Sequence, residues 1–127
     1  MKKLALIGRI LFAIPFAIMG LNHFLMTNVF LGMMSSFIPG GAFTVLITGA
    51  LLILASISII FNKFIKVACF GLAGILFIFI TTIHIPDLFT VNWELALIEL
   101  LKDTSLMGGA IVIAVYSDSI KVENIKE

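Results

Sequence analysis

Hydrophobic residues form long runs along this chain, and charged residues interrupt them at only a few points. The first run, residues 10–62, contains no charged side chain, and its one strong break is Pro39-Gly40-Gly41. A helix that crosses a bilayer needs about 20 apolar residues, so this run is long enough for two. Adjacent proline and glycine residues mark a turn. The pattern therefore predicts helices over about 4–21 and 42–61.

A second uncharged run follows at residues 67–86. It predicts a third helix over about 67–85. We expect Pro86 to end this helix, because proline lacks a backbone N–H and its ring collides with the preceding helical turn.

The fourth helix is less clearly marked. The last uncharged run, 104–117, is too short to cross about 30 Å of hydrocarbon at 1.5 Å per residue. We therefore expect the helix to begin near Trp93, an interfacial residue type, with Asn92 as its N-cap and Glu94 in the first turn, where the helix dipole favours a carboxylate. The predicted span is about 93–117.

The segment between the first two predicted spans has an amphipathic pattern. Small and polar residues recur at helical spacing, and hydrophobic residues fill the other positions; the small and polar ones are Asn28, Gly32, Ser35 and Ser36. This pattern predicts a short interfacial helix over about 27–37 at the outer membrane surface. Such a helix either covers a site as a lid or packs as a re-entrant element.

Composition narrows the class of protein. Of the 127 residues, 61% are hydrophobic and 12% are charged, against roughly 45–50% and 25% in soluble domains. These values exclude a soluble enzyme and a disordered tail, and a net charge of +1 provides no basic field for nucleic acid. The single cysteine, Cys69, excludes a disulfide framework and a cysteine-ligated iron–sulfur cluster. The expected fold class is all-α: a single transmembrane domain, residues 1–127, forming a four-transmembrane-helix bundle.

The distribution of lysine and arginine predicts the orientation of that bundle. With four spans, seven cationic residues share one side: Lys2, Lys3, Arg9, Lys63, Lys66, Lys121 and Lys126. Only Lys102 belongs to the other side. The positive-inside rule then places both termini in the cytoplasm, with the lipid bilayer as the first partner of the protein. The N-terminal run carries no small-residue cleavage site near residue 20, so we expect it to remain as the first span.

Ionisable side chains inside a membrane are costly, which makes each of them a candidate for function. His23 and His84 end the first and third predicted helices on the outer side. Glu99, Lys102 and Asp103 enter the fourth helix from that side, and their i, i+3 and i+4 spacing places them on one face. We expect this face to turn into the bundle. The five side chains would then define one ligand-binding pocket that opens outward.

Arg9 is the sixth candidate ligand-binding residue. It is fourteen residues from His23, which puts both on one helix face but about 21 Å apart along the axis. The two residues therefore cannot belong to one compact site. Arg9 either anchors the helix by snorkelling to the cytoplasmic interface or contacts the headgroup of a lipid or quinone.

Four interpretations of the outer pocket remain open. The first is a network of ion pairs whose members bond only one another and which fixes helix register. The second is a site for a quinone or similar amphipathic ligand, and such a site needs a proton-exchanging group at the end of an apolar slot. A metal site formed by His23 and His84 with Asp87 or Asp103 has suitable donors but no supporting ligand spacing, so no metal is expected. Two histidines at one depth also permit a single haem between them.

Three short motifs resemble the DoxX-like family of small four-helix membrane proteins. They are Gly8-Arg9-Ile10-Leu11-Phe12, Gly20-Leu21-Asn22-His23-Phe24, and the stretch from Lys102 to Gly108-Gly109. The matching polar or special positions are Arg9, Gly20, His23 and Lys102. The chain departs from the family in the second predicted helix, where relatives often place a glutamate after a small residue and this chain has Ala50 after Gly49.

The resemblance implies an inner-membrane protein that acts as an accessory or quinone-interacting subunit of a membrane redox system. We also expect it to associate with copies of itself or with a larger membrane protein. Two alternatives from other classes remain. One is a non-catalytic scaffold or assembly subunit, and the other is a small lipid-binding or transport module. The missing glutamate weakens any mechanism that uses a carboxylate on the second helix.

Overall fold

The computed structural model describes residues 1–34 and 38–126, with side chains up to residue 117. Every regular element in its described part is a helix and none is a strand, which confirms the all-α class. The elements in chain order are α1 (Lys2–Leu25), α2 (Thr27–Met33), α3 (Ala42–Ile60), α4 (Ile65–Phe79), the π-helical turn η1 (Ile80–His84), α5 (Ile85–Asp87) and α6 (Trp93–Lys126).

Three helical segments within the described residues are long and apolar enough to cross a membrane: Lys2–Leu25, Ala42–Ile60 and the continuous segment Ile65–Asp87. The α6 helix does not join them, although it is the longest. Its longest uncharged stretch, residues 104–117, is shorter than a span requires, and charged residues lie on both sides of it. The fourth span thus remains a prediction.

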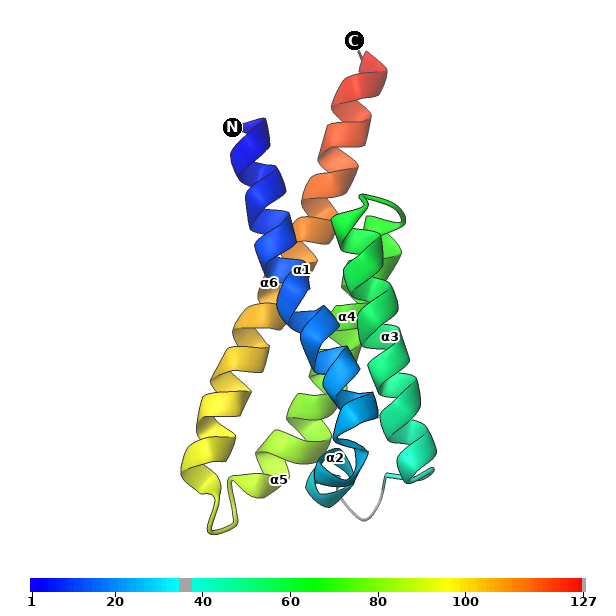
Figure 1. Cartoon of the computed structure of the whole chain (residues 1–127). Coiled ribbons are helices and arrows are strands. Elements are labelled where there is room, and N and C mark those ends of the chain that lie inside the picture. Colours follow the sequence, from blue (N-terminus) through cyan, green and yellow to red (C-terminus); the bar gives the residue numbers. More distant parts are fainter. Residues whose placement is uncertain (35–37, 127) are drawn as a thin grey trace.

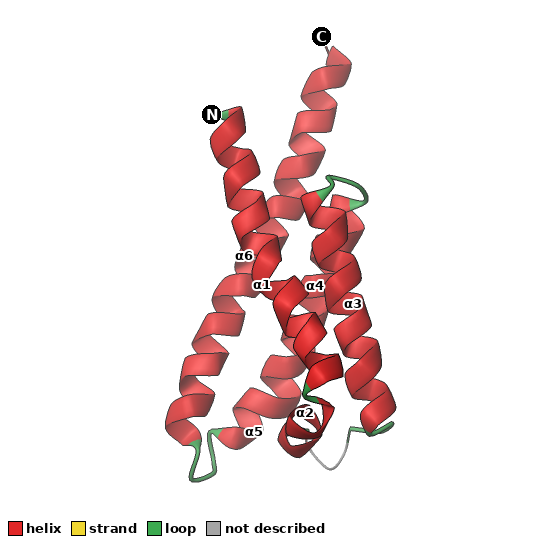
Figure 2. Ribbon diagram, in the orientation of Figure 1, coloured by secondary structure: helices red, strands yellow, loops and turns green. Residues whose placement is uncertain are grey.

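The long helices run alternately up and down the molecule (Figure 1). Both termini and the turn between α3 and α4 lie at one end, which we call the termini end. The α2 helix, α5 and the loop before α6 lie at the other, which we call the α2 end. The helices associate chiefly as two pairs, α1 with α3 and α4 with α6 (Figure 2).

The α1–α3 pair is held by close backbone contact and by a buried hydrogen bond. A Cβ atom on Gly20 would lie 2.7 Å from the carbonyl oxygen of Gly49, and one on Gly49 would lie 2.8 Å from that of Gly20. Only glycine permits this approach. Further along, the Ser56 hydroxyl donates to the carbonyl oxygen of Ala13 at 2.8 Å, and both residues are fully buried.

The two pairs join through a core that draws on α1, α3, α4 and α6. Its largest fully buried members are Phe16, Leu52, Ile59, Leu72 and Leu76, and Cys69 packs among them. Small residues bring α6 into this core, because Ala110 and Ala114 are both completely buried. The polar side chains predicted to share a pocket lie outside it, toward the α2 end.

The third helical segment ends at Asp87, two residues after the predicted end, and Pro86 does not end it. The chain passes from α4 through η1 into α5, so Pro86 lies inside a continuous helical segment. A π-turn widens the helix by one residue per turn, and this relieves the collision between a proline ring and the preceding turn. Thr82 also donates its hydroxyl to the carbonyl oxygen of Ile78 at 2.6 Å within this region.

Other boundaries differ by a few residues. The α1 helix extends to Leu25, past the predicted end at 21, so His23 lies in its last turn. The α2 helix confirms a short helix after the first span, but it ends at Met33. Met34 is predicted to be helical but has an extended backbone. The rest of the predicted 27–37 helix, including Ser35 and Ser36, falls on residues 35–37, which lie outside the described residues. The α6 helix begins at Trp93 as predicted, and the Asn92 carbonyl accepts its first bond, from Ala96 at 3.0 Å.

We expect Gly49→Ala to lower the free energy of unfolding by about 1–3 kcal/mol, the usual cost of overpacking a tight contact. The added methyl group would meet the Cβ atom of His23 at 2.6 Å and a backbone oxygen at 2.8 Å, and the backbone cannot move aside cheaply. The control is Gly71→Ala in α4, where nothing lies within 4 Å of the added atom. Thermal unfolding in detergent measures both, and equal melting temperatures would contradict the close crossing.

Candidate ligand-binding pocket

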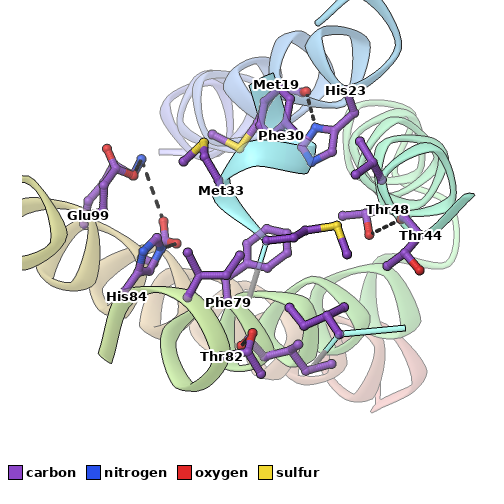
Figure 3. A pocket seen from close by; sticks show the side chains of 17 residues that line it. Met19, His23, Phe30, Met33, Thr44, Thr48, Phe79, Thr82, His84 and Glu99 are labelled. Atoms are coloured by element: carbon purple, nitrogen blue, oxygen red, sulfur yellow. Dashed lines mark hydrogen bonds and ion pairs between the residues drawn. The ribbon is translucent and has the colours of Figure 1, made fainter. Parts of the chain in front are cut away.

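A pocket with a volume of about 170 Å³ opens between the two helix pairs at the α2 end (Figure 3). Most of its wall is apolar. It is lined by Met19 and His23 of α1, Phe30 and Met33 of α2, Met34 and Ile38 from the segment between α2 and α3, Thr44, Val45 and Thr48 of α3, Ile78 and Phe79 of α4, Thr82, Ile83 and His84 of η1, and Glu99, Lys102 and Asp103 of α6. The structure therefore brings together five of the six predicted site residues.

His23 belongs to the α1 side of the pocket and is held in three ways. Its Nδ1 atom lies 2.8 Å from the carbonyl oxygen of Met19, one turn back along the helix. Its ring stacks on Phe30, with the ring centroids 3.9 Å apart and the planes inclined by 20°. Its Cβ atom packs against Gly49. These contacts leave the residue only 4% exposed and its ring directed at the pocket (Figure 3).

His84 faces Asp103 across the gap between η1 and α6. The His84 Nε2 atom lies 2.7 Å from the Asp103 Oδ2 atom, and both side chains are less than 10% exposed. Because a carboxylate oxygen can only accept, Nε2 carries the proton and donates it. The π-turn is what presents His84 to α6, since widening the helix by a residue changes the direction of every side chain after it.

Glu99 and Lys102 form a second ion pair at the rim of the pocket. The Lys102 ammonium contacts the Glu99 Oε2 atom and lies 3.9 Å from the Asp103 Oδ1 atom. The prediction that Glu99, Lys102 and Asp103 are all buried toward the bundle is wrong for Lys102, whose side chain is 40% exposed, and only partly right for Glu99. A long lysine chain reaches past the pocket edge while its ammonium still contacts both carboxylates.

Arg9 does not line the pocket. It lies two turns before Phe16 on α1, toward the termini end, and is half-buried. Its Nε atom is buried, and no hydrogen bond to it occurs within the described residues. The structure thus separates Arg9 from the other five candidates, as the spacing along the helix predicted.

Three donor groups in the pocket have the types that bind metal ions. Ligand atoms of His84, Glu99 and Asp103 lie within 4.8 Å of one another. This set differs from the predicted one, because neither His23 nor Asp87 belongs to it. Lys102 already supplies a positive charge to both carboxylates, so a metal ion would have to displace it. A haem between the two histidines is disfavoured for a similar reason, since the Nε2 atom of His84 contacts Asp103.

Sequence reasoning missed the uncharged polar residues of the pocket. Thr44 and Thr48 are one turn apart on α3 and line the wall beside His23. The Thr44 hydroxyl donates to the carbonyl oxygen of Pro39 at 2.5 Å, and that of Thr48 to the carbonyl oxygen of Thr44 at 2.8 Å. Their i, i+4 spacing in an apolar helix was the available signal.

Comparison with family models, with curated proteins and with solved structures gives no significant match. The resemblance to the DoxX-like family therefore stays a prediction that rests on the three sequence motifs.

We expect Asp103→Ala to lower the free energy of unfolding by about 3–5 kcal/mol, the range seen when one partner of a buried ion pair is removed. Glu99→Ala is the matched control on the same helix face. Its pair with Lys102 is partly exposed, and such pairs contribute about 1 kcal/mol or less. Chemical unfolding in mild detergent compares the two variants. A larger loss for Glu99→Ala than for Asp103→Ala would contradict the assignment of the buried pair.

Proposed function

We propose that this protein is a DoxX-like inner-membrane protein with four spans and both termini in the cytoplasm. It acts as an accessory subunit of a membrane redox system by binding the ring of a quinone-type ligand. The pocket at the α2 end holds the ring, and the apolar tail of the ligand extends into the outer leaflet. The single observation that carries the binding proposal is an apolar pocket with ionisable groups from α1, η1 and α6 in its wall.

The arrangement of the helices supports four spans. Both termini and the turn between α3 and α4 share one end of the molecule (Figure 1), as an even number of crossings requires. That end also carries Lys2, Lys3, Lys63 and Lys66. A fourth span must include charged residues of α6 that precede its apolar stretch. Of these, Asp103 is buried against His84, and Lys102 is paired with Glu99 at the pocket.

The size of the pocket supports a ring headgroup as ligand. A cavity of about 150 Å³ in an apolar protein core accepts one benzene molecule. The pocket volume of about 170 Å³ matches one substituted ring and leaves no room for a long tail. Stacked aromatic side chains at His23 and Phe30 provide a flat contact surface next to that space. The pocket is open, so a tail can leave it toward lipid.

A scaffold or assembly subunit is the second candidate. The observation that favours it is the pairing of charges on the η1 and α6 side, where His84 bonds Asp103 and Lys102 bonds Glu99. Such a network fixes the register of two helices without any ligand. A small lipid-binding or transport module is the third candidate, and it would use the same pocket for an acyl chain rather than for a ring.

Reporter fusions test the topology. We expect fusions at Pro39 and Asp87 to report the outer side of the membrane, and fusions at Lys63 and at the C-terminus to report the cytoplasm. The physical reason is that cationic segments resist translocation. A C-terminal fusion that reports the outer side would show that α6 does not cross, leaving three spans.

Filling the pocket tests the binding proposal. We expect Thr48→Phe to weaken binding of a decyl-substituted para-benzoquinone at least about tenfold, or about 1.4 kcal/mol, because the added ring occupies the space of the ligand. The control is Ile47→Phe, which adds the same ring one residue away on the exposed face of α3. Titration of the purified protein in nanodiscs, followed by the fluorescence of Trp93, measures binding.

Equal weakening by the two variants would place any binding outside the pocket. No binding by the unmodified protein, combined with a stable larger complex from native membranes, would establish the scaffold instead. Displacement of the bound quinone by a fatty acid of equal tail length would favour the lipid-binding module.

A further inference from the structure

We propose that the pocket selects the reduced, hydroquinone form of its ligand over the oxidised quinone. This inference rests on the proposed function, since it assumes that a quinone-type ring enters the pocket. It concerns the hydrogen-bonding character of the two pocket walls. The wall formed by α1 and α3 offers acceptors, whereas the wall formed by α6 offers a donor, Lys102, beside the carboxylates of Glu99 and Asp103.

The hydrogen bond of His23 to the backbone determines the character of the first wall. The carbonyl oxygen of Met19 can only accept, so the Nδ1 atom of His23 carries the proton and donates it over 2.8 Å. In a neutral imidazole the other nitrogen is then an acceptor. No hydrogen bond to the His23 Nε2 atom occurs within the described residues. The ring lines the pocket, and stacking against Phe30 covers its face but not its edge.

The two threonines beside His23 have the same character. Each hydroxyl has one hydrogen, and a backbone carbonyl already binds it: that of Pro39 for Thr44, and that of Thr44 for Thr48. What remains on each oxygen is acceptor capacity. The wall of α1 and α3 therefore presents acceptors from His23, Thr44 and Thr48 and no spare donor among these three residues.

The opposite wall supplies the donor. The ammonium of Lys102 has three N–H bonds and no acceptor. Glu99 accepts one of them, and Asp103 lies 3.9 Å away, beyond hydrogen-bond distance. Lys102 lines the pocket and can donate to an oxygen of the ligand there.

A ligand that bonds both His23 and Lys102 must donate at one end and accept at the other. Each hydroxyl of a hydroquinone can donate or accept a hydrogen bond. One therefore donates to the Nε2 atom of His23 while the other accepts from Lys102. Both oxygens of a quinone only accept. A quinone therefore satisfies Lys102 but faces His23 acceptor to acceptor, and a site that binds a hydroxyl rejects an analogue that cannot donate.

The experiment compares three probes that share a decyl-substituted ring: the para-hydroquinone, its dimethyl ether and the quinone. Binding is measured under anaerobic conditions to the full chain in nanodiscs. We expect the hydroquinone to bind at least about tenfold more tightly than either of the others, which corresponds to about 1.4 kcal/mol.

Two conservative variants separate the acceptor from the packing of His23. In His23→Asn the amide places an N–H group at the position of Nδ1, so the bond to Met19 is kept, but the side chain ends before Nε2. In His23→Gln the amide reaches the position of Nε2, and its oxygen accepts. We expect the preference for the hydroquinone over the ether to disappear in His23→Asn and to persist in His23→Gln.

The outcomes distinguish this inference from the proposed function. Equal affinity of the unmodified protein for quinone and hydroquinone would overturn the selection and leave quinone binding in place. A preference that survives unchanged in His23→Asn would also overturn it, because the extra bulk of the ether would then explain the difference. Binding of none of the three probes would overturn the proposed function and the selection together.

Discussion

The close contact of α1 and α3 at Gly20 and Gly49 is the constraint on which the pocket depends. Two helices whose backbones touch cannot also hold large side chains between them, so bulk is displaced to either side of the crossing. On one side lie Phe16 and Leu52 of the core, and on the other lies His23, with its Cβ atom against Gly49. The crossing fixes the Cβ atom of His23. The hydrogen bond to Met19 and the stacking on Phe30 then fix the orientation of its ring.

The π-turn has the corresponding role on the other side of the pocket. If α4 continued as a regular α-helix, Pro86 would break or kink it, and His84 would point in another direction. With the π-turn, the segment stays helical to Asp87 and His84 reaches Asp103 of α6. Such turns are frequent at functional sites. Here it allows one helix to contribute both to the core, through Leu76, and to the polar wall, through His84.

How much the sequence could predict follows from the range of each interaction. Runs of apolar residues and helical spacing are local, and they predicted the long helices and the shared face of Glu99, Lys102 and Asp103. The burial of each side chain depends on contacts between distant segments. Asp103 is buried against His84, while the long side chain of Lys102 extends to the exposed rim of the pocket. The π-turn η1 and the orientation of the Thr44 and Thr48 hydroxyls depend on hydrogen bonds to backbone carbonyls, which residue types alone do not specify. The separation of Arg9 was predictable because it follows from helix rise.

The contrast between the two walls bears on the choice between a ligand site and a scaffold. A network that serves only to hold helices together gains most when all of its buried polar atoms are paired with one another. On the η1 and α6 wall the buried His84–Asp103 pair meets that condition, and the Lys102–Glu99 pair lies partly exposed at the rim. On the α1 side, by contrast, the imidazole of His23 is bound at one nitrogen and directs its ring at an open apolar space. Helix packing alone does not require a histidine there, since a residue of similar size with no second nitrogen would fill the same contact with Gly49 and Phe30. The arrangement therefore favours a pocket that is completed by a hydrogen-bonding ligand over one that is complete in itself.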